Sequence, residues 1–342
     1  MEKKKVTIYS IAETIGITPT AVSYVINGKY HKVSEATREK VLAEIKRTGY
    51  VPDATARNLS RGKSRLVGLF LPTLKEDNSH SFMLENPFYM EFIAAIEKFN
   101  RDSGYDLVLG CKNQDDFIRW ALSRNFDAVI LLGKFPSEEA FKIEQLHMPL
   151  IFIDVYASEF KKHLNIRSND RLGTYLATKH LIELGHKKIG FVGSESRSQL
   201  DNERYLGYVE ALEEAGIKET ITYTCYPNFA GGFDVANKII EDDRVTAVVC
   251  TADIIAIGVI SAYEQRGKKV PENLSVVGFD DLRTATYVFP PLTTIRQHID
   301  KKAEIVMDLL KKQLNNIEVK ENLVVIEPEL IIRNSTKPYT NE

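Results

Sequence analysis

From residue 66 onward the chain repeats one pattern, in which a short apolar run is followed by a stretch with helical periodicity. The apolar runs form a first series at residues 66–71, 105–109, 128–132 and 150–154, and a second at 188–192, 246–250, 274–279 and 323–333. Strands that alternate with helices, such as the one expected at 201–215, form parallel sheets with right-handed crossovers. Two series therefore predict two Rossmann-like lobes, with a ligand site between them at the carboxyl ends of the strands.

The first 50 residues differ and predict three short helices, at 8–15, 19–27 and 34–49. Gly16 ends the first helix, and Thr18 caps the second with Pro19 in its first turn, where a missing N–H costs nothing. The polar segment that follows, residues 51–65, contains Pro52 and has too few apolar residues to fold alone. We therefore expect an all-α headpiece at 1–50, a hinge helix and linker at 51–65, and a two-lobed domain at 66–342.

The distribution of charge separates the N-terminal part from the rest. Residues 1–65 hold 13 Lys and Arg against 6 Asp and Glu, a net charge of +7, which leaves −9 for the remainder of a chain with net charge −2. A small basic unit on an acidic body favours contact between that unit and a polyanion such as DNA. Solvated surface charge gives the same pattern, so charge alone does not identify the partner.

The turn between the first two helices, from Glu13 to Thr20, has the short spacing and central glycine of a helix-turn-helix, whose second helix enters the major groove of DNA. A generic helical hairpin fits this spacing too. If the segment binds DNA, its outward N-terminal face presents Pro19, Thr20 and Tyr24 to base edges. The residues placed for phosphate contacts are Thr7, Tyr9, Ser23 and Asn27.

Residues 6–64, VTIYSIAETIGITPTAVSYVINGKYHKVSEATREKVLAEIKRTGYVPDATARNLSRGKS, resemble the headpiece and hinge of the LacI/GalR repressor family. Similar phrases recur along the chain, among them NPFYMEF, DRLGTYLATKHLIELGHKKIGFVG, VPENLSVVGFDD and PPLTTIRQ. The resemblance implies a helix-turn-helix headpiece and a periplasmic-binding-protein-like core. It also implies a homodimer that reads a pseudo-palindromic operator.

The resemblance adds Thr18, Tyr50, Ala56 and Leu59 to the predicted DNA-binding residues. Leu59, in ARNLSRG, corresponds to a hinge-helix leucine that wedges into the minor groove at the operator centre. An apolar wedge unstacks a base step and kinks the duplex, so the role is physically reasonable. The alternative is that Leu59 packs against the core domain.

By the same resemblance a small-molecule effector binds between the lobes. The polar candidates suit a polyhydroxylated ligand, because carboxylates accept from adjacent hydroxyls and a guanidinium donates: Asp154, Asp253, Asp280 and Arg204. The aromatic candidates would cover the apolar faces of a sugar: Phe88, Tyr89, Phe229 and Phe279. Asp253 and Asp280 equally fit caps of helices, and the aromatic residues equally fit the core. Ala252 stands where many sugar-responsive relatives carry an asparagine.

Other classes of protein find little support. The cysteines, Cys111, Cys225 and Cys250, are widely spaced, no motif for metal, phosphate or nucleophilic chemistry occurs, and no apolar run suits a signal peptide or a membrane span. His180 and His186 fit a turn or helix end better than a metal site. We therefore expect a cytoplasmic regulator without enzymatic activity, cofactor or metal, and not a transport-type sugar-binding protein.

The leading hypothesis is a repressor of carbohydrate-utilisation genes that a sugar releases from its operator. The alternative is a regulator of the same family that depends on a co-repressor (a purine, a phosphorylated metabolite or a partner protein) or that activates. Residue types do not decide between these.

Overall fold

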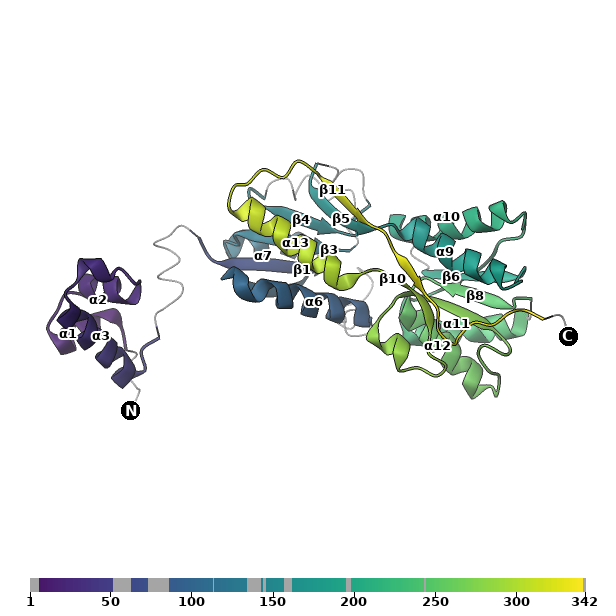
Figure 1. The fold of residues 1–342 in the computed structure, drawn as a ribbon, viewed down its shortest axis with the longest axis horizontal. Helices are drawn as coiled ribbons and strands as arrows, with labels where there is room; N and C mark the ends of the chain where they lie inside the picture. Colours follow the sequence, from purple (N-terminus) through teal and green to yellow (C-terminus); the bar gives the residue numbers. More distant parts are fainter. Residues whose placement is uncertain are drawn as a thin grey trace. The chain divides into compact units, whose positions relative to one another are not determined.

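The structure is a computed structural model that describes residues 6–51, 63–72, 86–112, 114–133, 143, 146–156, 162–194, 198–242 and 244–340. The chain divides into two compact units, Met1–Ser64 and Arg65–Glu342, each described by itself below (Figure 1).

The N-terminal unit, here called the headpiece, is a three-helix core. Its helices are α1 (Ile8–Ile15), α2 (Pro19–Ile26) and α3 (Glu35–Thr48), with a 3₁₀ turn η1 (Tyr30–Lys32) between the last two. Thr7, Thr18 and Ser34 cap the three helices by accepting a hydrogen bond from a first-turn N–H. Gly16 ends α1 in the left-handed conformation, with φ +70°. The predicted helices are confirmed to within a residue at their ends, which the capping residues occupy.

The second unit contains two six-stranded sheets. Lobe 1 has the strand order β11-β5-β4-β3-β1-β2. Its strands are β1 (Leu66–Pro72), β2 (Asp106–Lys112), β3 (Ala128–Leu132), β4 (Leu150–Ile153), β5 (Leu164–Ser168) and β11 (Leu323–Ile326). Helices α6 (Pro87–Asn100) and α13 (Ile299–Leu314) cover one face, and α7 (Gln114–Ser123) contributes to the other; a 3₁₀ turn, η2 (Arg101–Ser103), follows α6. All pairs in this sheet are parallel, as in β1, where Leu69 lies opposite both Leu109 and Ile130.

Lobe 2 has the strand order β12-β10-β9-β8-β6-β7. Its strands are β6 (Ile189–Ser194), β7 (Ile221–Cys225), β8 (Ala247–Cys250), β9 (Ser275–Asp280), β10 (Thr293–Arg296) and the antiparallel β12 (Glu329–Ile331). Helices α9 (Asp170–Glu183) and α10 (Gln199–Glu214) cover one face. Helices α11 (Phe229–Asp242) and α12 (Asp253–Gln265) cover the other, beside the 3₁₀ turn η5 (Arg283–Thr286).

The prediction of two Rossmann-like lobes is confirmed, but the prediction of one last strand at 323–333 is wrong. The structure divides that segment into β11 in lobe 1 and β12 in lobe 2, because Pro328 lacks the N–H that a continuing strand would donate. Three strands, β5, β7 and β10, were not predicted. They are short and rich in polar residues, such as LNIRS and TTIR.

Three segments of the described chain cross between the lobes, after β5, after β10 and after β11. They are tied to one another, since the Ser168 hydroxyl donates to Gln297 Oε1 at 3.1 Å and the Asn169 side-chain amide donates to Glu327 at 3.3 Å. The second crossing returns α13 to lobe 1, where Figure 1 shows this yellow helix beside α6. The two lobes are therefore joined by a hinge of three connecting segments that are hydrogen-bonded to one another.

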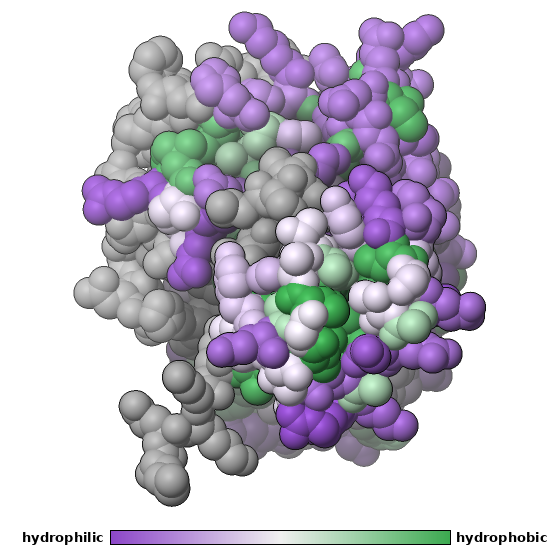
Figure 2. Space-filling model, turned by 90° about the vertical axis from the view of Figure 1, so that its left-hand side faces the viewer, coloured by the Kyte–Doolittle hydropathy of each residue, from purple (hydrophilic) through white to green (hydrophobic). Residues whose placement is uncertain are grey.

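Among the described residues, no helix is long and apolar enough to cross a membrane. Figure 2 shows mostly hydrophilic residues on the surface that faces the viewer, with smaller apolar patches among them.

Candidate functional site

Helix α2 of the headpiece presents one face to the core and the other to the surface. Val22 and Val25 are buried against α1 and α3. On the remaining face Thr20 is exposed and Pro19 and Tyr24 are half-buried. All three predicted base-reading residues therefore have exposed surface, Pro19 and Thr20 in the first turn of α2, at the positive end of the helix dipole, and Tyr24 further along the helix.

The predicted phosphate-contacting residues lie at the start of α1 (Thr7 and Tyr9) and toward the end of α2 (Ser23 and Asn27). Thr7 caps α1 through a reciprocal pair of hydrogen bonds with Ser10, and Tyr9 is 69% exposed. The Asn27 side-chain amide donates to the Ser23 carbonyl and hydroxyl oxygens at 2.8 and 3.2 Å, which fixes both side chains. Thr18 is exposed, but its hydroxyl accepts from the Ala21 N–H at 3.2 Å as the cap of α2.

Two further headpiece features bear on DNA binding. The Lys32 ammonium lies 5.1 Å from the centre of the Tyr24 ring, which places a cation beside a predicted base-reading residue. Tyr50 is half-buried and packs against the headpiece core. Ala56 and Leu59 lie outside the described residues, so their roles stay predictions.

In the second unit the structure brings several predicted effector residues together at the junction of the lobes. We call this group the junction cluster; its predicted members are Tyr89, Asp154, Arg204, Phe279 and Asp280. Tyr89, from α6 of lobe 1, is half-buried, and desolvation of its hydroxyl raises the pKa of that group. The carboxylates of Asp280, Asp154 and Asp201 raise that pKa further, and Arg204 lowers it. Tyr89 therefore lies in the field of charged groups from both lobes.

Asp154, at the end of β4, is paired with a residue that the sequence did not indicate. The Lys302 ammonium of α13 donates to the two Asp154 carboxylate oxygens at 2.9 and 2.8 Å, and no part of the Lys302 side chain is exposed. The Ser168 N–H also donates to Asp154, at 3.2 Å. Asp154 has a positive φ of 56°, a conformation unusual for aspartate that places its carboxylate at the junction.

Arg204, in α10, is buried and bound on two sides. Its Nε donates to Asp170 Oδ1 at 2.7 Å, its Nη2 forms an ion pair with the same oxygen at 2.7 Å, and its Nη1 donates to the Thr251 carbonyl. Its guanidinium lies 3.8 Å from the centre of the Phe279 ring. Phe279 is fully buried in the lobe 2 core and stacks on the arginine, so it suits the core alternative better than contact with a ligand.

Asp170 and Tyr156 were missed at the level of sequence. The Tyr156 hydroxyl, from the segment after β4, donates to Asp170 Oδ2 at 2.5 Å and to the Ser168 carbonyl at 3.1 Å. Burial raises the pKa of Tyr156, and the neighbouring Asp170 carboxylate adds to that rise. Asp170 therefore joins a lobe 1 tyrosine to a lobe 2 arginine.

The two remaining carboxylates differ. Asp280 ends β9 with φ 132° and accepts from the Gln297 side-chain amide at 2.5 Å, and burial raises its pKa well above the ordinary value. Asp253 is completely buried and accepts from the Leu282 N–H at 2.8 Å and from the Thr294 hydroxyl. Burial raises the pKa of Asp253 to about 7. Because both of its oxygens bind lobe 2, Asp253 suits the structural alternative better than the ligand-binding one.

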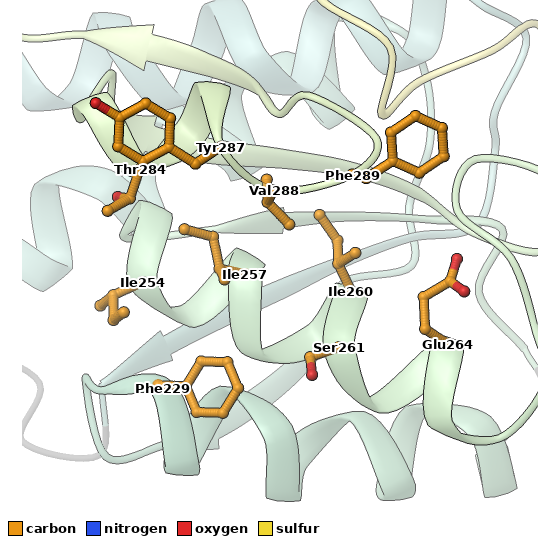
Figure 3. Close-up of a pocket in the computed structure, with 10 residues that line it drawn as sticks. All are labelled: Phe229, Ile254, Ile257, Ile260, Ser261, Glu264, Thr284, Tyr287, Val288 and Phe289. Atoms are coloured by element: carbon orange, nitrogen blue, oxygen red, sulfur yellow. The ribbon is translucent and has the colours of Figure 1, made fainter.

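The other two aromatic candidates lie elsewhere. Phe88 is half-buried and packs against the lobe 1 core beside Tyr89 and Phe92, with ring centroids 5.7 and 6.3 Å away. Phe229 lines an open apolar hollow of about 470 Å³ on lobe 2. Figure 3 shows Ile257 and Ile260 of α12 between Phe229 on one side and residues 287–289 on the other. No described contact joins Phe229 to the junction cluster.

Two family models match the chain. The one described as bacterial regulatory proteins, lacI family, matches residues 7–53, and the one described as a periplasmic binding protein-like domain matches residues 178–336.

Among curated proteins, the HTH-type transcriptional repressor PurR of Mannheimia succiniciproducens is 32% identical over 342 residues, 97% of this chain and 98% of that protein. The ribose operon repressor of Haemophilus influenzae is 29% identical over 340 residues, 96% of this chain and 98% of that protein. A solved structure of the lac repressor dimer bound to operator and an anti-inducer superposes with a TM-score of 0.85 at 25% identity, covering 98% of this chain and all of that one.

Proposed function

The chain belongs to the lacI family of bacterial regulatory proteins, and we propose that it represses transcription by binding an operator from which a sugar effector releases it. The observation that carries the proposal is the presence in one chain of a helix-turn-helix headpiece and of a buried polar cluster to which both lobes contribute. Neither part alone would link DNA binding to a small molecule.

Helix α2 enters the major groove in this proposal. Thr20, Pro19 and Tyr24 read base edges, while Thr7 and the Ser23–Asn27 pair hold phosphates. The exposed basic residues around η1, among them Lys32, supply the salt-dependent part of the affinity. Leu59 acts as the minor-groove wedge at the centre of the operator.

The effector binds at the junction cluster. Asp280 and Asp154 accept hydrogen bonds from sugar hydroxyls, and an unused N–H group of the Arg204 guanidinium donates to a sugar hydroxyl. A ligand held by both lobes changes their closure about the hinge at Ser168, Asn169 and Gln297. Closure then alters the spacing of the two headpieces, so effector and operator binding are linked.

The active form in this proposal is a homodimer, as the lac repressor is in the structure described above. Tyr287 and Phe289 are 76% and 84% exposed beside the apolar hollow of lobe 2, and this surface gains most from contact with a second copy. Since its target is DNA, we place the protein in the cytoplasm. Its relatives are regulators, and we propose no enzymatic activity.

The test is an operator titration at fixed salt with fragments from around the protein's own gene, repeated with a panel of sugars. We expect one sugar to release the full-length protein. The variant Leu59→Ala should bind operator at least about tenfold more weakly while it binds the sugar as before, because the wedge contributes only to the DNA complex. Equal loss of both activities would contradict the assigned wedge, and tighter DNA binding with a ligand would favour the co-repressor alternative.

A further inference from the structure

The Arg204 guanidinium already has a carboxylate partner, although it is the strongest anion-binding group of the junction cluster. Its Nε donates to Asp170 Oδ1, its Nη2 lies 2.7 Å from the same oxygen, and its Nη1 donates to the Thr251 carbonyl. One face lies on the Phe279 ring. A phosphate or carboxylate on a ligand binds arginine best through two parallel N–H groups, on either the Nε–Nη2 or the Nη1–Nη2 edge. Asp170 lies on the first edge, and Nη1, which the second edge requires, already donates to the Thr251 carbonyl.

The charge of the cluster points the same way. Three carboxylates, those of Asp154, Asp170 and Asp280, lie among the described residues of the junction. The cations Lys302 and Arg204 are already paired, with Asp154 and Asp170 respectively, and a third cation, Arg167, lies over the Tyr156 ring. Asp280 has no cation within ion-pairing distance among the described residues. An anionic ligand would therefore enter a buried site in which carboxylates already balance the charges of Lys302 and Arg204.

The position of Asp170 is fixed from several directions. It is 1% exposed at the start of α9, and Asn169 caps that helix. The Tyr156 hydroxyl holds its second oxygen at 2.5 Å, and the ring of Tyr156 is covered by the Arg167 guanidinium at 4.3 Å. A ligand anion would have to displace a carboxylate that Arg204 and Tyr156 hold in place.

We propose that Asp170 is a specificity-determining residue that occupies the Arg204 fork and restricts the effector to uncharged polyhydroxylated molecules, excluding sugar phosphates and sugar acids. The proposal rests on the effector site proposed above. In this proposal the unused N–H groups of Arg204 and the Asp280 carboxylate bind hydroxyl groups of the ligand. Asp170 accounts for the exclusion of anions.

The experiment measures the thermal stability of the full-length protein at constant ionic strength while inorganic phosphate replaces chloride, and again with glucose, glucose 6-phosphate and gluconate. The variant Asp170→Asn keeps the size and the oxygen of the side chain but removes the charge. We expect it to bind phosphate at least about tenfold more tightly than the parent, as a saturable rise in Tm. The control Asp253→Asn removes a buried charge nearby but leaves the Arg204 fork occupied, so its response should equal that of the parent.

Phosphate binding by the headpiece is common to all three proteins and cancels in the comparison. A parent protein that binds phosphate or glucose 6-phosphate as tightly as Asp170→Asn does would overturn the proposal, as would an Asp170→Asn variant that folds but gains no anion binding. Should Asp170→Asn not fold, the parent decides alone: stabilisation by an anionic sugar overturns the proposal, and indifference to anions supports it. These measurements need no operator, so a failure to bind DNA would count against the proposed function only.

Discussion

Lys302 and Asp154 form an ion pair with almost no contact with water, since their side chains are 0% and 6% exposed. Removing charges from water is costly, and the pair offsets that cost only while both partners are present. The Ser168 N–H and Gln297 complete the hydrogen bonding of the pair. The pair thus ties α13 to β4 at the point where the lobes meet.

We predict that Lys302→Met lowers the free energy of unfolding by about 3–5 kcal/mol, because it leaves the Asp154 carboxylate buried without a cation. Urea denaturation of the second unit measures this. The control Lys98→Met removes an exposed lysine of α6 that pairs with Asp300 of α13, and it should change the free energy little. Similar small losses in both variants would show that the buried pair contributes no more than a surface one.

The residues that meet at the junction of the lobes were predictable in part. Asp154 and Asp280 stand out in the sequence because a carboxylate directly follows or ends an apolar strand. Lys302 does not, since it lies in IDKKAE, which looks like a solvated helix face, and it reaches Asp154 across 148 positions of sequence. Asp170 was hidden for a similar reason, because an aspartate in the first turn of a helix is ordinary and only the fold shows its contact with Arg204.

Helices α9 and α10 pack unusually closely, and a glycine allows it. A Cβ atom on Gly207 would lie 2.0 Å from the Arg171 carbonyl oxygen and 3.0 Å from the Tyr175 nitrogen. Both are backbone atoms of α9 and cannot turn aside. The contact positions Arg204, one turn earlier on α10, against Asp170 at the start of α9.

We predict that Gly207→Ala destabilises the protein by about 3 kcal/mol or more, because the two helices must separate. The matched control is Gly216→Ala, just after α10, where no atom lies within 4 Å of the added Cβ and only the positive φ of 72° is unfavourable. That variant should lose about 1 kcal/mol. Urea denaturation of both variants decides, and equal losses would mean that the close approach carries no special cost.

The sequence predicted helices better than strands, for physical reasons. The headpiece helices have capping residues at both ends, and these signals are local. By contrast, β5 (LNIRS) and β10 (TTIR) lack long apolar runs, because they are short and carry polar groups that bind at the hinge and the C-terminal segment. In β7 every second residue is exposed, as expected for the edge of a sheet, so no continuous apolar run marks it.

At the scale of the whole molecule, the C-terminal segment after β12 is held on lobe 2 by two histidines. His186 Nε2 donates to the Lys337 carbonyl at 3.1 Å, and Nδ1 of the neutral ring accepts from the Thr246 hydroxyl at 2.8 Å. His180 contacts the Thr336 hydroxyl at 3.1 Å. Burial lowers the pKa of both histidines; the carbonyl of Lys337 opposes this at His186, and Glu183 opposes it at His180.

We predict that stability falls with acid for this reason. The folded state binds fewer protons than the unfolded state, in which the histidine pKa is about 6.5, so the stabilisation is complete above that pH and declines as the pH falls below it. His186→Gln should be less stable than the parent at pH 7.5 and should lose less stability between pH 7.5 and 5.5. The exposed His147→Gln serves as the control, and urea denaturation at both pH values measures the difference. An unchanged pH dependence in His186→Gln would refute the assignment.

The three crossings between the lobes also set an order for folding during synthesis. The apolar face of the lobe 1 sheet is closed by Ala303, Val306 and Met307 of α13, which leave the ribosome only after nearly all of lobe 2. The headpiece, in contrast, is complete within the first 50 residues or so. The headpiece of a nascent chain can thus fold long before the two-lobed unit is complete. Until α13 is synthesised, part of the apolar face of the lobe 1 sheet stays exposed, and exposed apolar surface of this kind promotes aggregation.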